Sequence, residues 1–277
     1  MSDIALINDS QQSAIVTNGI GKNGEIYMKA AGSTDAGALV VYDSGSWRKF
    51  EDEASSFSNA YSVSFDNSND YATATLGSQV FDGDYSISFW FNANTSQDYS
   101  TLFQSGPGTA YTAGFRLYRL ANGSLQFYKG LGGYVLILDA GSTSTNTWYH
   151  VAITRSGTTT TLYLNGSSID TGTDSAAYAS QLIYINTGAL SYFFGGLTDE
   201  VALWDSALSA SDISTLRGGA SAGTLGVPGD ISSLDPVNWW RMGDNDGGTG
   251  TTITDQGSGS NDVTLVNGPT FSSSVPS

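Results

Sequence analysis

The sequence predicts an all-β protein, an antiparallel sandwich built from many short strands. Glycine is frequent, with 34 residues among 277, whereas charged residues make up only 13% of the chain. That balance is typical of short strands joined by tight turns rather than of helices. Segments of alternating apolar and polar residues recur at short intervals between turn signals, which favours a sandwich or barrel over parallel βαβ units.

The strands of the main part of the chain are predicted at 61–65, 71–76, 85–92, 101–104, 114–120, 125–129, 134–138, 148–155, 159–165 and 195–204. Because successive side chains of a strand point to opposite faces, Ile87 and Phe89 share the core face and Trp90 lies on the other. Asn165 and Gly166 can both adopt positive φ angles, which predicts a type I′ hairpin turn between two of these strands.

One segment carries the signals of a short helix. Ser209 can cap its N-terminus, Asp212 stands three residues further on as in a capping box, and Gly218 can end it. The Gly-, Ser- and Pro-rich residues 219–236 are predicted to form a connector. We expect 237–277 to add two further strands that pack on the sandwich.

The chain is predicted to divide into a short leader, residues 1–57, and one large domain, residues 58–277. The leader contains a strand, a turn and a second strand near 38–50, followed by an acidic linker. A β appendage of this size is not stable alone. We therefore expect it to anchor the protein to a partner or to other copies of the chain.

Charge and composition exclude several classes of partner. The formal charge of −16 and the pI near 4.1 repel phosphate backbones, so no nucleic acid is expected to bind. The sequence has no cysteine, which excludes disulfides and thiolate chemistry. We also predict neither a signal peptide nor membrane insertion, because the chain has no basic and apolar N-terminal region and no long apolar run.

Five motifs follow one another in the main domain. They are Ser-Phe-Asp-Asn-Ser-Asn-Asp-Tyr at 64–71, the strand at 86–91, Trp-Tyr-His-Val-Ala at 148–152, Leu-Tyr-Leu-Asn-Gly at 162–166, and the segment 196–209 that contains Leu-Thr-Asp-Glu-Val. In this order they resemble the laminin-G-like, concanavalin A-like lectin/glucanase superfamily. The resemblance implies an antiparallel jelly-roll β-sandwich, to which this sequence adds the small N-terminal β appendage and the one short helix.

A further block, Trp-Trp-Arg-Met-Gly-Asp at 239–244, also resembles the superfamily but usually precedes the first motif, whereas here it follows the helix. With the short leader, this order resembles laminin-G-type structural proteins of bacteriophages, particularly marine ones. That resemblance implies a non-enzymatic virion protein, a capsid decoration, fibre or tail component made in the host cytoplasm. Its expected partners are other virion proteins through the N-terminal segment, glycans of the host surface, and further copies of the chain.

Three alternatives stay open at this point. A lectin module would bind glycans without a virion, a cement protein would join the virion without glycan affinity, and a glycan hydrolase would cleave its ligand. The superfamily resemblance implies that a hydrolase would carry Glu-x-Asp-x-x-Glu on one strand, and this run is absent. In an ideal strand the neighbours Asp199 and Glu200 point to opposite faces. We therefore predict that the protein is not an enzyme.

Glycan contacts are expected from aromatic residues on strand faces opposite the core, because exposed aromatic rings on a sheet often mark interaction surfaces. The predicted carbohydrate-binding residues are Trp90, Tyr118, Tyr128 and Tyr163. The alternative is that loops or a neighbouring subunit cover these rings. His150, the only histidine of the chain, is expected to be a structural strand residue on the face opposite the core.

Calcium is the one cofactor that the resemblance implies. Members of the superfamily commonly join an early loop to the Asp of the Asp-Glu strand through a cation, and calcium needs only oxygen ligands. The corresponding residues are Asp199 with Asp66 or Asn67. The alternative interpretation is that Asp199 caps a turn by hydrogen bonding.

Overall fold

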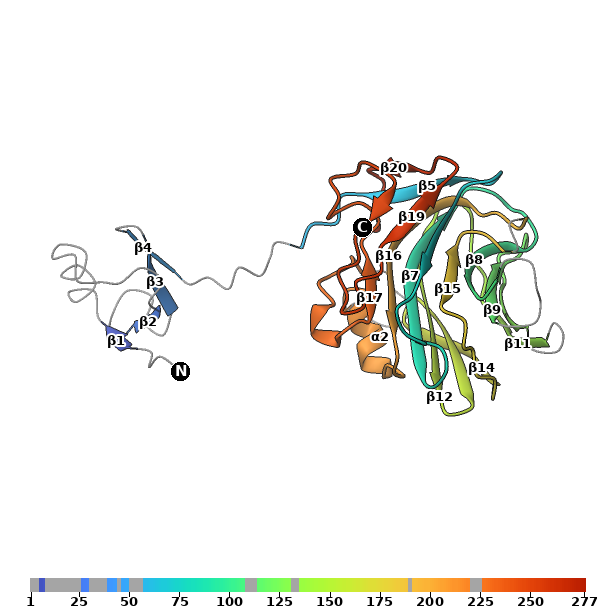
Figure 1. Cartoon of the computed structure of the whole chain (residues 1–277), viewed down its shortest axis with the longest axis horizontal. Helices are drawn as coiled ribbons and strands as arrows, with labels where there is room; N and C mark the ends of the chain where they lie inside the picture. Colours follow the sequence, from blue (N-terminus) through green and yellow to red (C-terminus); the bar gives the residue numbers. More distant parts are fainter. Residues whose placement is uncertain are drawn as a thin grey trace. The chain divides into compact units, whose positions relative to one another are not determined.

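The computed structural model of the protein describes residues 57–107, 114–130, 135–188, 191–219 and 226–277, together with the backbone of four strands nearer the N-terminus. The chain forms two compact units, Met1–Phe57 and Ser58–Ser277 (Figure 1). In the first unit, four strands form one sheet in the order β1 (Ala5–Ile7), β2 (Ile26–Lys29), β3 (Leu39–Asp43) and β4 (Ser46–Lys49). Strands β3 and β4 pair as the hairpin that the sequence predicts near 38–50.

The second unit is a sandwich of two antiparallel sheets, which confirms the predicted fold class. Sheet I has the order β11 (Val135–Ala140), β10 (Leu125–Lys129), β9 (Phe115–Arg119), β8 (Ser100–Ser105), β15 (Leu182–Ile185), β6 (Tyr71–Thr75), β19 (Val263–Val266) and β18 (Thr252–Ile253). Sheet II has the order β14 (Ser167–Thr173), β13 (Thr159–Leu164), β12 (Trp148–Ser156), β7 (Tyr85–Ala93), β16 (Gly195–Trp204), β5 (Ser62–Asp66) and β20 (Thr270–Ser272), and β17 (Asn238–Trp240) pairs with β16.

The core lies between the two sheets and follows the predicted alternation. Phe89 of β7 and Val151 of β12 come from sheet II, and Phe103 of β8, Phe115 and Leu117 of β9 come from sheet I; all are buried in one hydrophobic cluster. Burying each of these side chains contributes about 1.5–3 kcal/mol relative to leaving it in water. The sheets are thus fixed face to face, and what remains for function is their outer faces and their edges.

Two local predictions are confirmed. The hairpin turn between β13 and β14 has φ angles of 48° at Asn165 and 74° at Gly166, as a type I′ turn requires. A Cβ atom on Gly166 would also lie 2.0 Å from Nε of Arg217, so this position excludes larger residues. Helix α2 (Ala210–Leu216) begins with the predicted capping box of Ser209 and Asp212. None of the described helices has the length and apolar character needed to cross a membrane.

The C-terminal segment contributes strands to both sheets, and it forms four strands where the sequence predicts two. Strand β17 pairs with β16, β19 pairs with β6, and β20 pairs with β5, beside which it lies in Figure 1. Strands β5 and β6, the partners of β20 and β19, lie around the first superfamily-like motif, at 64–71.

Between β5 and β16, two strands are missing from the sequence-based predictions. Ser167–Thr173 forms β14 although it lacks apolar alternation, because the hairpin turn returns it along β13. Leu182–Ile185 forms β15 between β8 and β6 in the middle of sheet I. Its four apolar and aromatic residues are too few to establish a periodicity.

Candidate functional site

Four tyrosine rings meet on the outer face of sheet I. The ring of Tyr118 is the centre, with its centroid 5.5 Å from that of Tyr99, 5.8 Å from that of Tyr128 and 6.0 Å from that of Tyr192, each pair edge to face. Tyr99 and Tyr192 are also in contact, at 6.2 Å. We call these four residues the tyrosine cluster. Edge-to-face ring pairs contribute about 0.5–1.5 kcal/mol beyond their buried area, so the rings hold one another in place.

Strand alternation explains how the cluster forms. Phe115 and Leu117 of β9 point into the core, so Tyr118 points outward, and the pairing of β9 with β10 sets Gln126 opposite it. Tyr192 belongs to the segment before β16, and its carbonyl oxygen accepts a hydrogen bond from the amide of Thr101 in β8 at 3.1 Å. Two strands and two loops that are far apart in sequence therefore meet on this face.

Polar side chains surround the tyrosine cluster and bind one another. Arg116 donates from Nε to Oε1 of Gln104 at 2.5 Å and from Nη1 to the hydroxyl of Tyr118 at 3.1 Å. The hydroxyl of Tyr128 donates to Oε1 of Gln126 at 3.0 Å, and Nε2 of Gln126 donates to Asp139 at 2.9 Å. Such a network orients a ligand through a few fixed donors and acceptors, while the rings supply contact area.

The cluster has a buried centre and an accessible border. Tyr118 is 1% exposed, whereas Tyr99 is 43% exposed, and Tyr128 and Tyr192 are partly exposed. Tyr99 also has a φ angle of 60°, which is rare for an aromatic residue and costs of the order of 1 kcal/mol. The fold therefore holds an exposed ring at the border of the cluster in a backbone conformation that a tyrosine does not prefer.

Two of the four aromatic residues predicted to contact glycans have no exposed face. Trp90 and Tyr118 are each 1% exposed. Trp90 lies opposite the core, as predicted, but it packs against His150 with ring centroids 5.2 Å apart. The chain that follows β16 crosses this outer face of sheet II, where the hydroxyl of Ser86 bonds to backbone atoms of Ser206 and Leu208. Strand alternation therefore predicts the correct face of sheet II for Trp90, but it does not predict that the ring is buried there.

Tyr163 lies apart from the other predicted tyrosines. It is partly exposed and points outward from β13 of sheet II, whereas Tyr118 and Tyr128 belong to sheet I. The structure therefore brings together two of the predicted residues, Tyr118 and Tyr128, and separates them from Trp90 and Tyr163.

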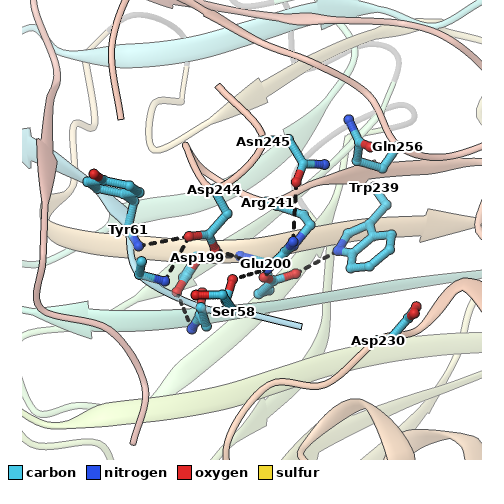
Figure 2. Close-up of polar contacts among 12 residues, drawn as sticks. Ser58, Tyr61, Asp199, Glu200, Asp230, Trp239, Arg241, Asp244, Asn245 and Gln256 are labelled. Atoms are coloured by element: carbon cyan, nitrogen blue, oxygen red, sulfur yellow. Dashed lines mark hydrogen bonds and ion pairs between the residues drawn. The ribbon is translucent and has the colours of Figure 1, made fainter. Parts of the chain in front are cut away.

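A second group of polar residues lies at β16 and β17. Carboxylate oxygens of Asp199, Glu200 and Asp244 approach within 4.8 Å of one another. Figure 2 shows Arg241 among them. Its Nε donates to Oε1 of Glu200 and its Nη2 to Oδ2 of Asp244, both at 3.2 Å. We call these four residues the carboxylate cluster.

The carboxylate cluster holds the beginning of the second unit. Arg241 donates from Nη2 to the carbonyl oxygen of Ser58 at 2.6 Å, and Oδ1 of Asp244 accepts the amides of Ala60 and Tyr61 at 2.7 and 3.0 Å. These contacts are drawn in Figure 2. The cluster thus fixes the segment that leads into β5.

The prediction that Asp199 and Glu200 point to opposite faces is wrong. The register between β16 and β7 shifts between Asp199 and Ala202, and Glu200 has a φ angle of 48°. A β-bulge of this kind re-aims side chains, so both carboxylates join the same cluster. The alternating Thr-Asp-Glu-Val sequence carries no Gly or Pro that would have signalled a bulge.

The structure does not bring together the residues implied for calcium. Asp66 pairs with Gly195, four residues before Asp199 on β16, which places them about 13 Å apart along the strand. Oδ1 of Asp66 accepts backbone amides of its own turn, including that of Ser68 at 2.8 Å. Asn67 donates from its side-chain amide to Oε1 of Gln97. This ligand set does not fit a shared cation. Calcium binding stays a prediction; among the described residues, the carboxylates close enough to hold one ion are those of Asp199, Glu200 and Asp244.

Residues 66–214 match the laminin G family model of the concanavalin A-like lectin/glucanases superfamily. The chain belongs to this superfamily. The match covers the strands from the end of β5 to α2, including every strand that contributes to the tyrosine cluster. Among curated protein sequences, the comparison gives no match.

Solved structures that are similar to this superfamily member share little sequence with it. A candidate carbohydrate-binding protein from Bacteroides ovatus is 17% identical with a TM-score of 0.55, covering 91% of this chain and 70% of that one. Domain 4 of the GH43 extracellular arabinanase AbnA from Geobacillus stearothermophilus, in complex with arabinotriose, is 17% identical with a TM-score of 0.47, covering 73% and 94%. The CBM40 of the Ruminococcus gnavus IT-sialidase is 16% identical with a TM-score of 0.46, covering 57% and 96%.

The carboxylate cluster has the spacing of a catalytic pair but not its access. Retaining glycosidases place two carboxyl groups about 5 Å apart and raise the pKa of the acid. In this superfamily member, burial raises the pKa of Asp199, and the charge of Glu200 raises it further. Asp199 is 0% and Glu200 6% exposed, and Oε2 of Glu200 accepts the indole N–H of Trp239 at 2.6 Å. A sugar cannot reach these oxygens in this conformation.

The carboxylate cluster predicts a pH-dependent stability. Burial raises the pKa of Glu200 from 4.5 to about 7, against the opposing effect of Arg241. Below pH 4.5 the carboxyl of Glu200 is protonated in both the folded and the unfolded state. Between pH 4.5 and 7 it has lost its proton in the unfolded chain but keeps it in the folded one, so the free energy of unfolding decreases as pH rises. We expect this group to contribute a decrease of about 3 kcal/mol across that interval.

Urea unfolding of the wild type and Glu200→Gln at a series of pH values measures this contribution. The glutamine keeps an acceptor for Trp239 but has no proton to release, so its curve should be flatter than the wild-type curve between pH 4.5 and 7. Parallel curves for the two proteins would contradict the assignment.

Sequence reasoning missed Tyr99, Tyr192, Arg241 and Asp244. The two tyrosines lie outside the predicted strands, so alternation assigns them no face. Arg241 and Asp244 belong to the Trp-Trp-Arg-Met-Gly-Asp block, which contributed no residue to the predicted sites. In these loops, bulky or charged residues stand beside polar ones, which is a signal of a site. One sequence alone does not show which loops lie next to each other in the fold.

Proposed function

We propose that the second unit binds carbohydrate through the tyrosine cluster and does not catalyse a reaction on it. The observation that carries this proposal is the cluster itself, in which exposed Tyr99 stands beside partly exposed Tyr128 and Tyr192, on the rigid support of buried Tyr118. Rigid aromatic rings give a large contact area with little loss of side-chain freedom. The apolar faces of sugar rings suit such a surface.

The polar network supplies the hydrogen bonds that a sugar needs. Gln126 and Asp139 lie next to the rings and fix each other's orientation through a hydrogen bond. Membership of a superfamily described as lectins and glucanases supports carbohydrate as the ligand class. The fold likeness to the Bacteroides ovatus protein adds support. The burial of Asp199 and Glu200 supports binding without hydrolysis.

A glycan array followed by calorimetric titration of the strongest ligand tests this function. We expect Tyr99→Ala to weaken binding by at least about tenfold, because an exposed aromatic contact is worth of the order of 1.5 kcal/mol or more. Tyr163→Ala is the matched control, since it removes a partly exposed tyrosine from sheet II. Equal affinities for wild type and Tyr99→Ala, or a loss in Tyr163→Ala alone, would overturn the proposal. Release of shorter products from the ligand would overturn the absence of catalysis.

A virion location is a separate proposal that rests on the sequence resemblance to phage structural proteins. The division into Met1–Phe57 and Ser58–Ser277 supports its first element, a small N-terminal unit that anchors a larger binding unit to virion proteins or to further copies. Mass spectrometry of purified virions tests the location. Absence of the chain from virions of a phage that encodes it would contradict the proposal, and the carbohydrate-binding function would stand without it.

A further inference from the structure

The charges of the second unit are distributed unevenly between interior and surface. Residues 58–277 contain 18 Asp and Glu residues but only six Lys and Arg residues. The segments of this unit outside the described residues contain no charged residue. All of its charged side chains can therefore be assigned to the interior or to the surface.

The basic residues are held within the fold. The arginines Arg116, Arg119, Arg155 and Arg217 are all buried. Arg241, 11% exposed, pairs with the carboxylate cluster, and Lys129, 21% exposed, lies 3.8 Å from Asp174. The exposed charged residues, in contrast, are all acidic: Asp66, Asp82, Asp84, Asp98, Asp139, Asp205, Asp230, Asp235 and Asp262. The surface thus presents negative charge to any approaching ligand.

The same imbalance holds at the tyrosine cluster. Arg116, the basic residue that is hydrogen-bonded to the cluster, is 5% exposed and donates to Gln104 and Tyr118. Two exposed carboxylates flank the rings: Asp98 precedes Tyr99 in the chain, and Asp139 accepts from Gln126 on β10. Recognition of an anionic sugar normally uses an arginine whose guanidinium can face the anion. Here the arginine is turned toward protein partners, and carboxylates stand at the border.

We infer that the tyrosine cluster selects uncharged saccharides and discriminates against those that carry a carboxylate or sulfate. This inference rests on the proposed carbohydrate-binding function and names its substrate class. Like charges repel within the Debye length, about 8–10 Å in ordinary buffers. An anionic sugar stacked on Tyr99 would lie within that distance of Asp98, since the two residues are adjacent.

Paired glycans on an array test the inference with the full chain. Each pair is a neutral oligosaccharide and the same oligosaccharide with one sialic acid, uronic acid or sulfate. We expect the charged member to bind at least about fivefold more weakly at low salt, and the difference to shrink as salt is added. Equal or tighter binding of charged members would overturn the inference while leaving the binding function intact. Binding of neither member would overturn the proposed function and the inference with it.

Charge-neutralising variants assign the effect to the site. Asp98→Asn removes a flanking charge and keeps an acceptor oxygen, and should improve binding of the charged member but not of the neutral one. Asp205→Asn makes the same charge change in the segment after β16, beyond sheet I, and serves as the control. An equal improvement in Asp205→Asn would assign the discrimination to overall charge and overturn its placement at the cluster.

Discussion

Replacing Arg241 by alanine is expected to destabilise the second unit by about 3–5 kcal/mol, because removing one partner of a buried ion pair leaves uncompensated charge. The guanidinium pairs with Glu200 and Asp244 and lies over the ring of Trp239, with its carbon 5.5 Å from the ring centroid. It also donates to the carbonyl oxygen of Ser58. Its loss would leave two buried carboxylates without their cation and free the start of the unit. Urea unfolding at neutral pH measures the effect.

Two comparisons separate charge from geometry in this experiment. Arg241→Lys restores the charge but not the planar fork that reaches both carboxylates, so its stability should fall between those of the alanine variant and the wild type. Lowering the pH should recover part of the loss in Arg241→Ala, because Glu200 with a pKa near 7 then becomes neutral. A loss below about 1 kcal/mol in Arg241→Ala, typical of a surface ion pair, would contradict this account of the cluster.

Replacing Tyr118 by alanine is expected to abolish measurable glycan binding and to lower the stability by about 2–4 kcal/mol. The ring is buried and contacts the other three rings of the tyrosine cluster. Without it, Tyr99 loses the ring that supports it and can no longer stay in one orientation. Calorimetric titration and urea unfolding on the same preparations separate the two effects.

Tyr118→Phe is the matched variant. It keeps the ring contacts and removes only the hydroxyl that accepts from Arg116, so stability should change by about 1 kcal/mol and binding by no more than a few-fold. If Tyr118→Ala folds and binds with wild-type affinity, the rings of this cluster do not form the binding surface.

The elements that the sequence predicted correctly are those governed by local chemistry. The alternation in β7 and β9, the positive φ angles at Asn165 and Gly166, and the capping box of Ser209 all depend on residues within a few positions of one another. The order of the five superfamily motifs then predicts the sandwich. Those features survive in the structure because tertiary packing agrees with them.

The features that the sequence did not predict depend on contacts between segments that are far apart in sequence. Whether an outward-facing ring is exposed is decided by what crosses it, as the chain after β16 does at Trp90. The bulge at Glu200 requires a positive φ angle that its sequence does not favour, and it persists because Arg241 and Trp239, about forty positions away, bind the carboxylate. Such strain is tolerated only where the surroundings over-determine it.

NMR titration of the full chain with its strongest array ligand locates the bound ligand. We expect chemical-shift changes to concentrate at Tyr99, Tyr118, Tyr128 and Tyr192 on the outer face of sheet I. Changes that concentrate around Tyr163 on sheet II or around the carboxylate cluster, with the tyrosine cluster unchanged, would contradict binding at this face.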